Sequence, residues 1–452
     1  MAQHRSGIGQ PPAEWSEWTN YLAAGLHGRH RWRLPLVFLG ILWANRRRTV
    51  TTWLRSAGVS HDFQDYYYLI AALARKSSWE IAERLFELLC QTVLRTMPPH
   101  ERLTAVIDDT PTSRYGPHVE GAGIHHNPTS GPDDHKFLYG HVWVVLSLAI
   151  RHPRWHTIGL PLLGLLYVKA KDIAKLPAQR SWQFQTKLEL AARLLRWAKN
   201  LAERCGRGLD VVFDGAYAYR PLLKEIPPSA RVFSRLRRDA ALWSVPPPAA
   251  PGSRGALRKY GTKRVSLAKR AGAKRGWQEA ECLVYGKQQP KLYKTFVATS
   301  RMVGGTIRVV LVKKADGDWE PFFCTDAQAS AVEIIEKFSD RSSIEQVFHD
   351  VKEVWGSGQQ QVRNLWCNIG VFNLNLWIST LVEMWAWSRP AALLRDRSDS
   401  PWDQRERRPS HADRRKALRL RMIENELVAA HRKHPMDRKI KNLVQTLTRL
   451  AA

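Results

Sequence analysis

The spacing of apolar residues changes along the chain, and each change marks a different kind of predicted element. The first hundred residues contain aromatic and leucine-rich segments with little strand alternation, which predicts a helical N-terminal region over residues 1–98. From Leu103 the chain has short runs of β-forming residues separated by loops, at 103–107, 137–150 and 158–168. These runs predict three strands.

A helix and further strands follow this first group. Apolar residues at helical spacing from Phe184 to Ala198 predict a long amphipathic helix, and the run 211–213 predicts a strand that ends at Asp214. A helix over 217–225 and a strand over 231–236 complete the series. This order is typical of an α/β fold with a ribonuclease H-like core, whose first part we place at residues 99–238.

The core is then interrupted. Residues 239–328 begin with prolines, glycines and a basic run, and continue with alternating runs at 292–299, 307–312 and 319–325. We interpret them as a basic loop and an inserted β-strand subdomain. Helices resume over 329–390 as the last part of the core, and residues 391–452 form a basic, helical C-terminal tail.

One long apolar stretch, 365–387, raises the question of a membrane span. It contains Asn368, Asn373, Asn375 and Glu383, so we predict a buried helix of a protein that does not enter a membrane. The five cysteines lack the C-x-x-C spacing of zinc sites and disulfide frameworks. A reducing cytoplasm fits this pattern.

Charge indicates the partner. The chain has 70 Lys and Arg against 41 Asp and Glu, a formal charge of +29. Such an excess favours a polyanion, and double-stranded DNA is the natural candidate. The alternatives are a ribosome-like basic protein and a protein that binds an anionic membrane surface.

Two segments are candidates for DNA contact. Residues 46–60 have the pattern of a helix-turn-helix, with Ser60 capping the second helix and Arg46, Arg47 and Arg48 in front of the first. An ordinary helical hairpin explains this pattern equally well. In the insertion, Lys259, Lys263 and Arg264 belong to a basic run that is either a DNA-tracking arm or a solvated loop.

Three acidic residues indicate the chemistry. Asp109 and Asp214 each follow an apolar strand, and Glu345 lies on a predicted helix. Three converging carboxylates require cations, and two divalent ions so held can cleave a phosphodiester. Hard oxygen ligands favour Mg2+ or Mn2+. Successive strand residues face opposite ways, so only one of Asp108 and Asp109 can be the main ligand, and we favour Asp109.

The third acid belongs to a specific spacing. In Phe338-x2-Arg341-x3-Glu345-x6-Lys352, all four residues fall within an arc of roughly 60° if they share one helix. One face of that helix packs, and its neighbour presents Arg341, Glu345 and Lys352. Ordinary helix-surface ion pairing of Arg341 and Lys352 with Glu345 is the alternative.

This run resembles the Y-x2-R-x3-E-x6-K motif of bacterial DDE transposases of the insertion-sequence-four group. The dipeptide Asp109-Thr110, Asp214-Gly215 and the β-rich insertion before the third acid are also similar to that group. The resemblance spans roughly residues 100 to 390 and is most specific at the third motif.

The resemblance implies cut-and-paste transposition: binding of terminal inverted repeats, cleavage at both ends, and attack of the 3′-hydroxyls on target DNA within a homodimer. Asp109, Asp214 and Glu345 would hold two metal ions, and Arg341 and Lys352 would grip the DNA backbone. Phe338 departs from the tyrosine of the motif and cannot donate a hydrogen bond. An aromatic residue of the insertion, Trp277 or Trp243, would trap a flipped base, with core packing as the alternative.

Two other functions remain open. A non-catalytic DNA-binding relative needs only the charge and the possible helix-turn-helix. A nuclease on the same core would cleave DNA without joining ends.

Overall fold

The computed structural model describes residues 10–126, 136–248, 256, 258–397, 400, 402–404, 406–433 and 444. The N-terminal part is helical, as its pattern predicts. Its elements are α1 (Ala13–Ala23), α2 (Gly28–Arg31), α3 (Arg33–Trp43), α4 (Val50–Ser56), α5 (Phe63–Ala72), a π-helical segment (Leu73–Ser77), α6 (Ser78–Thr92) and a short 3-10 helix (Leu94–Thr96).

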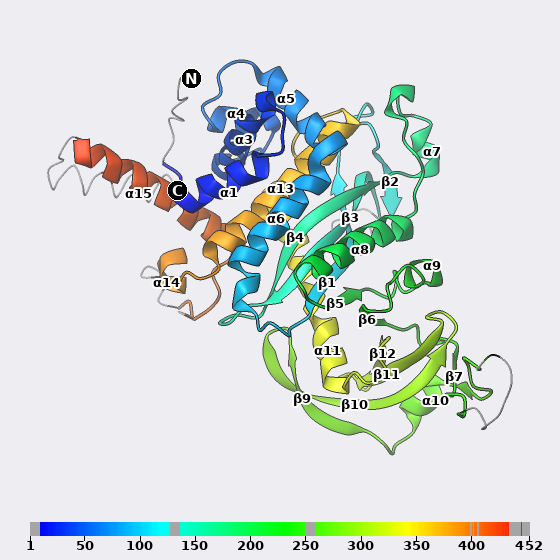
Figure 1. Ribbon diagram of the computed structural model, residues 1–452. Coiled ribbons are helices and arrows are strands. Elements are labelled where there is room, and N and C mark those ends of the chain that lie inside the picture. Colours follow the sequence, from blue (N-terminus) through cyan, green and yellow to red (C-terminus); the bar gives the residue numbers. More distant parts are fainter. Residues whose placement is uncertain are drawn as a thin grey trace.

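In the described part of the chain, twelve strands form one mixed sheet, which extends from the middle of the molecule to its lower end in Figure 1. Its first half contains β1 (Leu103–Ser113), β2 (Gly123–His126), β3 (Phe137–Arg151), β4 (Thr157–Tyr167), β5 (Leu209–Phe213) and β6 (Arg231–Arg235). Strand β3 pairs antiparallel with β1, β2 and β4, whereas β5 pairs parallel with both β1 and β6. The predicted strands are therefore present, and β1 continues six residues beyond the predicted end at Ile107.

The strands of the insertion continue the same sheet. They are β7 (Leu242–Trp243), β8 (Arg264–Val265), β9 (Gln278–Val284), β10 (Lys287–Ser300), β11 (Gly305–Lys313) and β12 (Trp319–Cys324), with the short helix α10 (Leu267–Gly272). Strand β12 pairs antiparallel with β6, which joins the two halves. The expected subdomain is thus an extension of the core sheet, and its long strands curve around α11 (Ala331–Asp340) in Figure 1.

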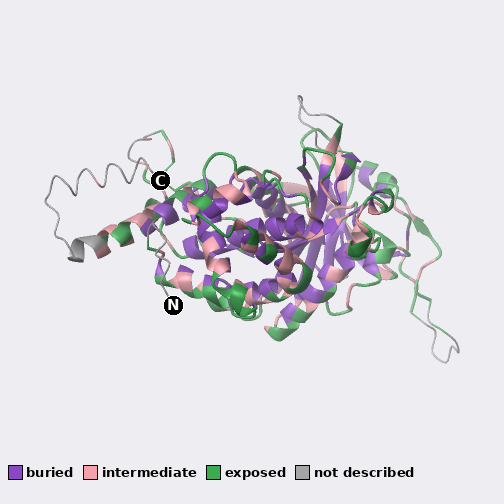
Figure 2. Ribbon diagram, turned by 90° about the horizontal axis from the view of Figure 1, so that it is seen from above, coloured by how far each residue is buried: buried purple, intermediate pink, exposed green. Residues whose placement is uncertain are grey.

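Helices cover both faces of the first half. One face carries α8 (Lys187–Arg204), with the small helices α7 (Ala170–Ile173) and α9 (Arg220–Leu223) nearby and a 3-10 turn at Ala178–Arg180. The other face carries α11, α12 (Ser342–Glu353) and α13 (Leu365–Ala386). Figure 2 shows the buried residues concentrated on the strands and on these covering helices.

Helix α13 is the centre of the helical half. It is the one described helix that is long and apolar enough to cross a membrane, and 94% of its most apolar window is buried inside the molecule. Its polar residues bond to neighbouring backbone: Asn373 both donates to and accepts from Gly164 of β4, at 3.1 and 2.8 Å. Thr380 donates to Pro161 at 2.6 Å. These contacts match the prediction of a buried helix.

The predicted helix-turn-helix segment has different boundaries. Helix α5 begins after Asp62 rather than after Ser60, and the three arginines lie in the loop before α4, which Thr49 caps. Helix α5 packs tightly on α13, since a Cβ on Gly370 would lie 2.3 Å from the carbonyl oxygen of Ile70. One face of α5 is therefore buried in the core.

The C-terminal region contains α14 (Ala391–Leu394) and α15 (His411–Lys433). The first half of α15 packs against α3 and α13, with Ala417, Leu418 and Met422 buried. Arg415 donates to the backbone carbonyl of Leu42 at 2.9 Å. Most of the tail beyond Lys433 lies outside the described residues.

Candidate active site

The first two acids of the site come from adjacent parallel strands. Thr104 of β1 lies opposite Asp210 of β5, and Ile107 lies opposite Phe213. Cross-strand partners point to the same face, and residues two apart share that face. Asp108, four residues after Thr104, therefore faces the same way as Asp214, four residues after Asp210.

That face is the one covered by α11 and α12. Lys337 of α11 donates to the Thr104 hydroxyl at 2.6 Å and lies 3.3 Å from the Asp210 carboxylate. Asp108 and Asp214 follow these two residues along their strands, so they lie against the junction of α11 and α12. Arg341 occupies that junction.

Arg341 stands among three carboxylates. Its Nη1 donates to Asp108 at 2.8 Å and its Nη2 donates to Glu345 at 2.5 Å. Burial lowers the pKa of Arg341, but the charges of Asp108, Glu345 and Asp214 outweigh this effect and raise it above its usual range. Arg341 thus pairs with Asp108 and Glu345, and Asp214, which pairs with Arg235 at 3.8 Å, lies near enough for its charge to act on both Arg341 and Asp108. We call Asp108, Asp214, Glu345 and Arg341 the acid cluster.

Asp108 is the most buried acid of the cluster. Its pKa is raised to about 6: burial is the main cause, Arg341 opposes it, and the charges of Asp109 and Asp214 add to it. Its side chain is 19% exposed, against 34% for Asp214 and 56% for Glu345. A carboxylate in this position has a strong requirement for a neighbouring cation.

Asp109 lies on the opposite face of β1, towards α8. Its carboxylate accepts hydrogen bonds from Lys187 at 2.6 Å and from the hydroxyl of Tyr217 at 2.8 Å. Burial and the charge of Asp109 raise the pKa of Tyr217 well above its usual value, so this hydroxyl remains a donor. The geometry therefore favours Asp108, the alternative first acid, over Asp109.

The sequence predicts two divalent metal ions at the acid cluster. The donor set consists of carboxylate oxygens, which suit Mg2+ or Mn2+. However, among the described residues no group of three or more His, Cys, Asp or Glu side chains is placed to hold a metal ion. In this structure Asp108 and Glu345 both bind the guanidinium of Arg341.

The helix expected from Phe338 to Lys352 is interrupted. Arg341 ends α11 and precedes α12, and two hydrogen bonds between residues three apart, Arg341 to Phe338 and Ile344 to Arg341, replace the helical pattern there. Phe338 packs against Phe322 of β12, with ring centroids 4.7 Å apart, and its ring lies 5.8 Å from the Arg341 guanidinium. Phe338 therefore packs next to the Arg341 guanidinium.

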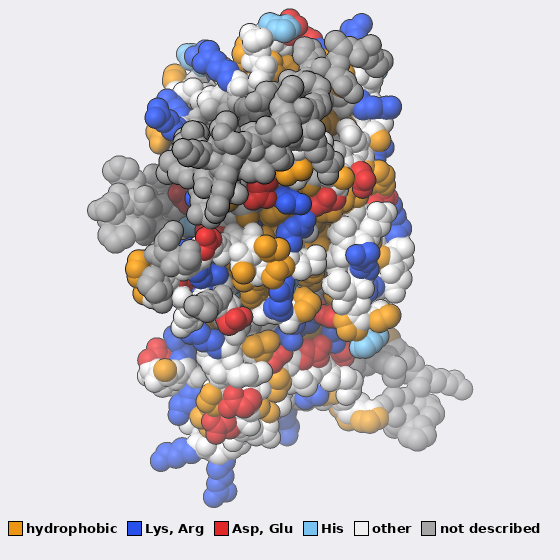
Figure 3. All heavy atoms as spheres, turned by 90° about the vertical axis from the view of Figure 1, so that its left-hand side faces the viewer, with side chains coloured by type: hydrophobic (Ala, Val, Ile, Leu, Met, Phe, Trp, Pro, Cys, Tyr) orange, Lys and Arg blue, Asp and Glu red, His pale blue; other side chains and the backbone are white. Residues whose placement is uncertain are grey.

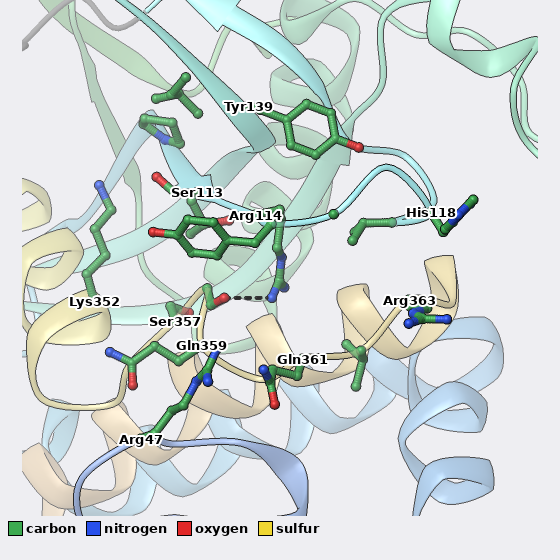
Figure 4. A pocket seen from close by; sticks show the side chains of 18 of the residues that line it. Arg47, Ser113, Arg114, His118, Tyr139, Lys352, Ser357, Gln359, Gln361 and Arg363 are labelled. Carbon is green, nitrogen blue, oxygen red and sulfur yellow. Dashed lines mark hydrogen bonds between the residues drawn. The ribbon is translucent and has the colours of Figure 1, made fainter. Parts of the chain in front are cut away.

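Residues predicted to contact DNA from two distant segments meet in one cavity. Arg46 and Arg47 from the loop before α4 line it together with Lys352 at the end of α12. Arg48 lies next to it, and its backbone N–H donates to Gln359 of the cavity wall at 3.1 Å. Figure 4 shows Lys352 and Arg47 on the same side of this cavity.

The candidates in the insertion lie elsewhere. Lys259, Lys263 and Arg264 are exposed near β8, the last strand at the far end of the sheet. Trp277 is half-buried and packs under Lys294, whose ammonium lies 4.7 Å from its ring centroid. Trp243 similarly packs under Arg301, at 4.6 Å. These residues do not join the acid cluster.

Several residues of the site have no signal in the sequence. Lys187 and Tyr217 reach Asp109 from α8 and from the loop after β5, and Arg114 and Tyr115 line the cavity beyond the end of β1. Each is a common residue type without a distinctive spacing. Only the pairing register of β1 and β5 could have indicated which of two adjacent aspartates faces Asp214.

Comparison with known proteins places the chain in a class. Residues 22–289, more than half of the chain, match the family described as DDE superfamily endonuclease, and the chain belongs to this family. The match includes Asp108, Asp109 and Asp214 and ends before Glu345. No curated protein matches the chain.

Among solved structures, the chain is similar to piggyBac transposase in a synaptic complex with hairpin DNA. The sequence identity is 10%, the TM-score is 0.36, and the similarity covers 96% of this chain and 81% of that chain.

Proposed function

We propose that the protein is a DNA transposase of an insertion sequence, which cleaves DNA and joins the ends by metal-dependent phosphoryl transfer. The observation that carries this proposal is the acid cluster, in which Arg341 pairs with Asp108 and Glu345 and Asp214 lies nearby, in a chain of the DDE superfamily. The resemblance of residues 338–352 to the insertion-sequence-four group supports transposition over simple hydrolysis.

We also assign a ribonuclease H-like core. Strands β4, β3, β1, β5 and β6 are neighbours in this order, with the first three antiparallel and the last three parallel. This arrangement brings Asp108 and Asp214 together at neighbouring positions. The helix that follows the insertion then adds Glu345 to the same face.

Asp108, Asp214 and Glu345 would hold the two divalent ions, which when bound activate the attacking water or 3′-hydroxyl and stabilise the departing oxygen. Arg341 would orient the scissile phosphate. Its Nε is buried and has no acceptor among the described residues, and its two terminal nitrogens hold Asp108 and Glu345 in place. Lys352, which forms no ion pair with a described residue, would contact the backbone further along the strand.

The partners follow from this function. The protein would bind the terminal inverted repeats of its element and then target DNA, as a homodimer assembled on DNA in the bacterial cytoplasm. The charge of +29 supports attraction to DNA.

Incubation of the purified protein with supercoiled plasmid carrying the element ends tests the proposal. We expect nicking in Mg2+ or Mn2+ and none in EDTA, followed by joining of a labelled 3′-hydroxyl end to a second plasmid. DNA binding without nicking would favour a non-catalytic relative. Nicking without any joined product would favour a nuclease.

Substitution of Lys352 separates a phosphate contact from a structural charge. Lys352→Ala should weaken DNA binding about equally for all sequences and reduce the slope of log K against log salt by about one, because one released counterion is lost. Binding titrations at several salt concentrations measure this slope. Lys199→Ala is a matched control, because Lys199 pairs with Glu203 on α8, across the sheet from the acid cluster. If Lys352→Ala keeps the wild-type slope, Lys352 does not contact a phosphate.

A further inference from the structure

We propose that the cavity beyond the acid cluster binds a short stretch of single-stranded DNA that leaves the cleaved site. The inference rests on the proposed function, and it assigns to the same enzyme a second DNA contact with a different specificity. We call this cavity the strand cleft. Its volume is about 1410 Å3, and its walls come from residues 46–47, 111–119, 137–139, 352–353, 357–359 and 361–363.

The strand cleft has an excess of positive charge that the protein does not neutralise. Five cationic side chains line it, and Glu353 is its one acidic lining residue. The five are Arg46, Arg47, Arg114, Lys352 and Arg363. None of them forms an ion pair with any carboxylate of the described residues. On the face shown in Figure 3, by contrast, Lys and Arg are interspersed with Asp and Glu. The charge of the strand cleft therefore favours the binding of an anion.

Arg114 gives the strongest reason for an anionic ligand. Its side chain is buried, and its guanidinium donates to His141 at 3.2 Å and to the carbonyl of Gly358 at 2.9 Å (Figure 4). Burial lowers its pKa to about 10, so the group remains charged at neutral pH. A buried cation without a carboxylate partner is costly unless an anion approaches it, and a phosphate in the cleft would satisfy this requirement.

Aromatic side chains distinguish a single strand from a duplex. Tyr115 is 84% exposed and Phe137 is 60% exposed, and both line the strand cleft with Tyr139. Exposed aromatic rings beside cations are the arrangement by which proteins stack unpaired bases and hold their backbone. The bases of a duplex are already stacked on one another and cannot use these rings.

The position of the cleft relates it to cleavage. Strand β1 continues from Asp108 to Pro111 and Ser113 in the cleft wall, and α12 continues from Glu345 to Lys352. Seven helical residues rise about 10 Å, and three strand residues span about the same distance. A strand that passes the acid cluster thus reaches the cleft within a few nucleotides.

Fluorescence anisotropy with a labelled single strand and with a blunt duplex of the same sequence tests the proposal. Tyr115→Ala and Arg363→Ala should each raise the dissociation constant for the single strand about tenfold or more and leave that for the duplex unchanged. Tyr115→Phe should bind like the wild type, because the phenyl ring still stacks. Both residues are exposed, so the substitutions leave the fold intact.

Trp402→Ala and Arg95→Ala serve as controls, since Trp402 is 81% exposed, Arg95 is exposed, and neither lines the strand cleft. Unchanged single-strand affinity in both cleft variants would overturn the inference, as would an equal loss for the duplex. Wild-type plasmid nicking, measured in parallel, tests the proposed function separately. Single-strand binding that depends on Tyr115, without plasmid nicking, would support the strand cleft and contradict the proposed transposase. Plasmid nicking without such binding would support the transposase and contradict the strand cleft.

Discussion

Asp108→Asn is expected to abolish plasmid nicking, whereas Asp109→Asn should retain most of it. Asp108 shares Arg341 with Glu345 and lies beside Asp214, so its loss removes one of three charges required to hold the metal ions. Metal ions supply several kcal/mol of transition-state stabilisation, and the rate should fall by about 1000-fold or more. Initial nicking rates in Mg2+ measure the difference.

The adjacent residue provides the matched control. Asp109 pairs with Lys187, whose side chain is 39% exposed, and such a pair contributes only about 0–1 kcal/mol. Because Asp109 faces α8 and is bound there by Lys187 and Tyr217, on the opposite face of β1 from Asp108, Asp109→Asn should change the nicking rate by less than about tenfold. Asp214→Asn and Glu345→Gln should match Asp108→Asn in lost cleavage and keep DNA binding. An inactive Asp109→Asn beside an active Asp108→Asn would assign the first acid to the other face of β1.

The two aspartates illustrate how far the sequence determines the site. The apolar run that ends at Ile107 predicts a strand end, and Pro111 reinforces it. In the structure β1 continues to Ser113, because β3 pairs with it throughout, whereas β5 pairs only as far as Ile107. Residues 108–113 thus form an edge strand, where a proline is tolerated. The face of the sheet to which Asp108 points therefore depends on this pairing between strands that are distant in sequence.

Local patterns were sufficient for the elements themselves. Strands β1, β3, β4, β5 and β6, the amphipathic helix α8 and the buried helix α13 follow from apolar spacing, whereas β2, in a Gly/Pro-rich segment, does not. The continuity of the sheet into the insertion does not, because the pairing of β12 with β6 joins residues about 90 positions apart. Likewise, the loop with Arg46 and Arg47 meets Lys352 only through the packing of the N-terminal helices on α13.

The helix break at Arg341 could not be predicted from apolar spacing either. The spacing of residues 338–352 predicts one helical face that presents Arg341, Glu345 and Lys352 together. In the structure Arg341 and Glu345 still pair at the spacing of one helical turn. Phe338 packs on Phe322 and lies 5.8 Å from the guanidinium, and Lys352 reaches the strand cleft. One motif therefore serves both the proposed metal site and the path of the DNA strand.

Glu383→Gln is expected to be the most destabilising single substitution at the joint between α13 and α15. The buried Glu383 carboxylate accepts from His411 at 2.7 Å, from Arg414 at 2.6 Å and from Arg408 at 3.1 Å. Removal of its charge leaves two buried guanidinium groups without a carboxylate, which costs roughly 3–5 kcal/mol of unfolding free energy. Urea unfolding measures the loss, and faster trypsin cleavage within α15 should accompany it.

The same contacts make the stability effect of Glu383→Gln depend on pH. Burial raises the pKa of Glu383, but Arg414, Arg408 and His411 outweigh it, so its pKa lies well below its usual range. The stabilisation by its charge is therefore complete above about pH 4.3, the usual glutamate pKa, and is lost as the pH falls towards the depressed value. Below that usual value, the unfolding free energies of wild type and Glu383→Gln should converge. Glu424→Gln, which breaks an exposed pair with Arg421, should change stability by less than about 1 kcal/mol at any pH. A Glu383→Gln variant as stable as this control at neutral pH would show that α15 docks without the buried charge.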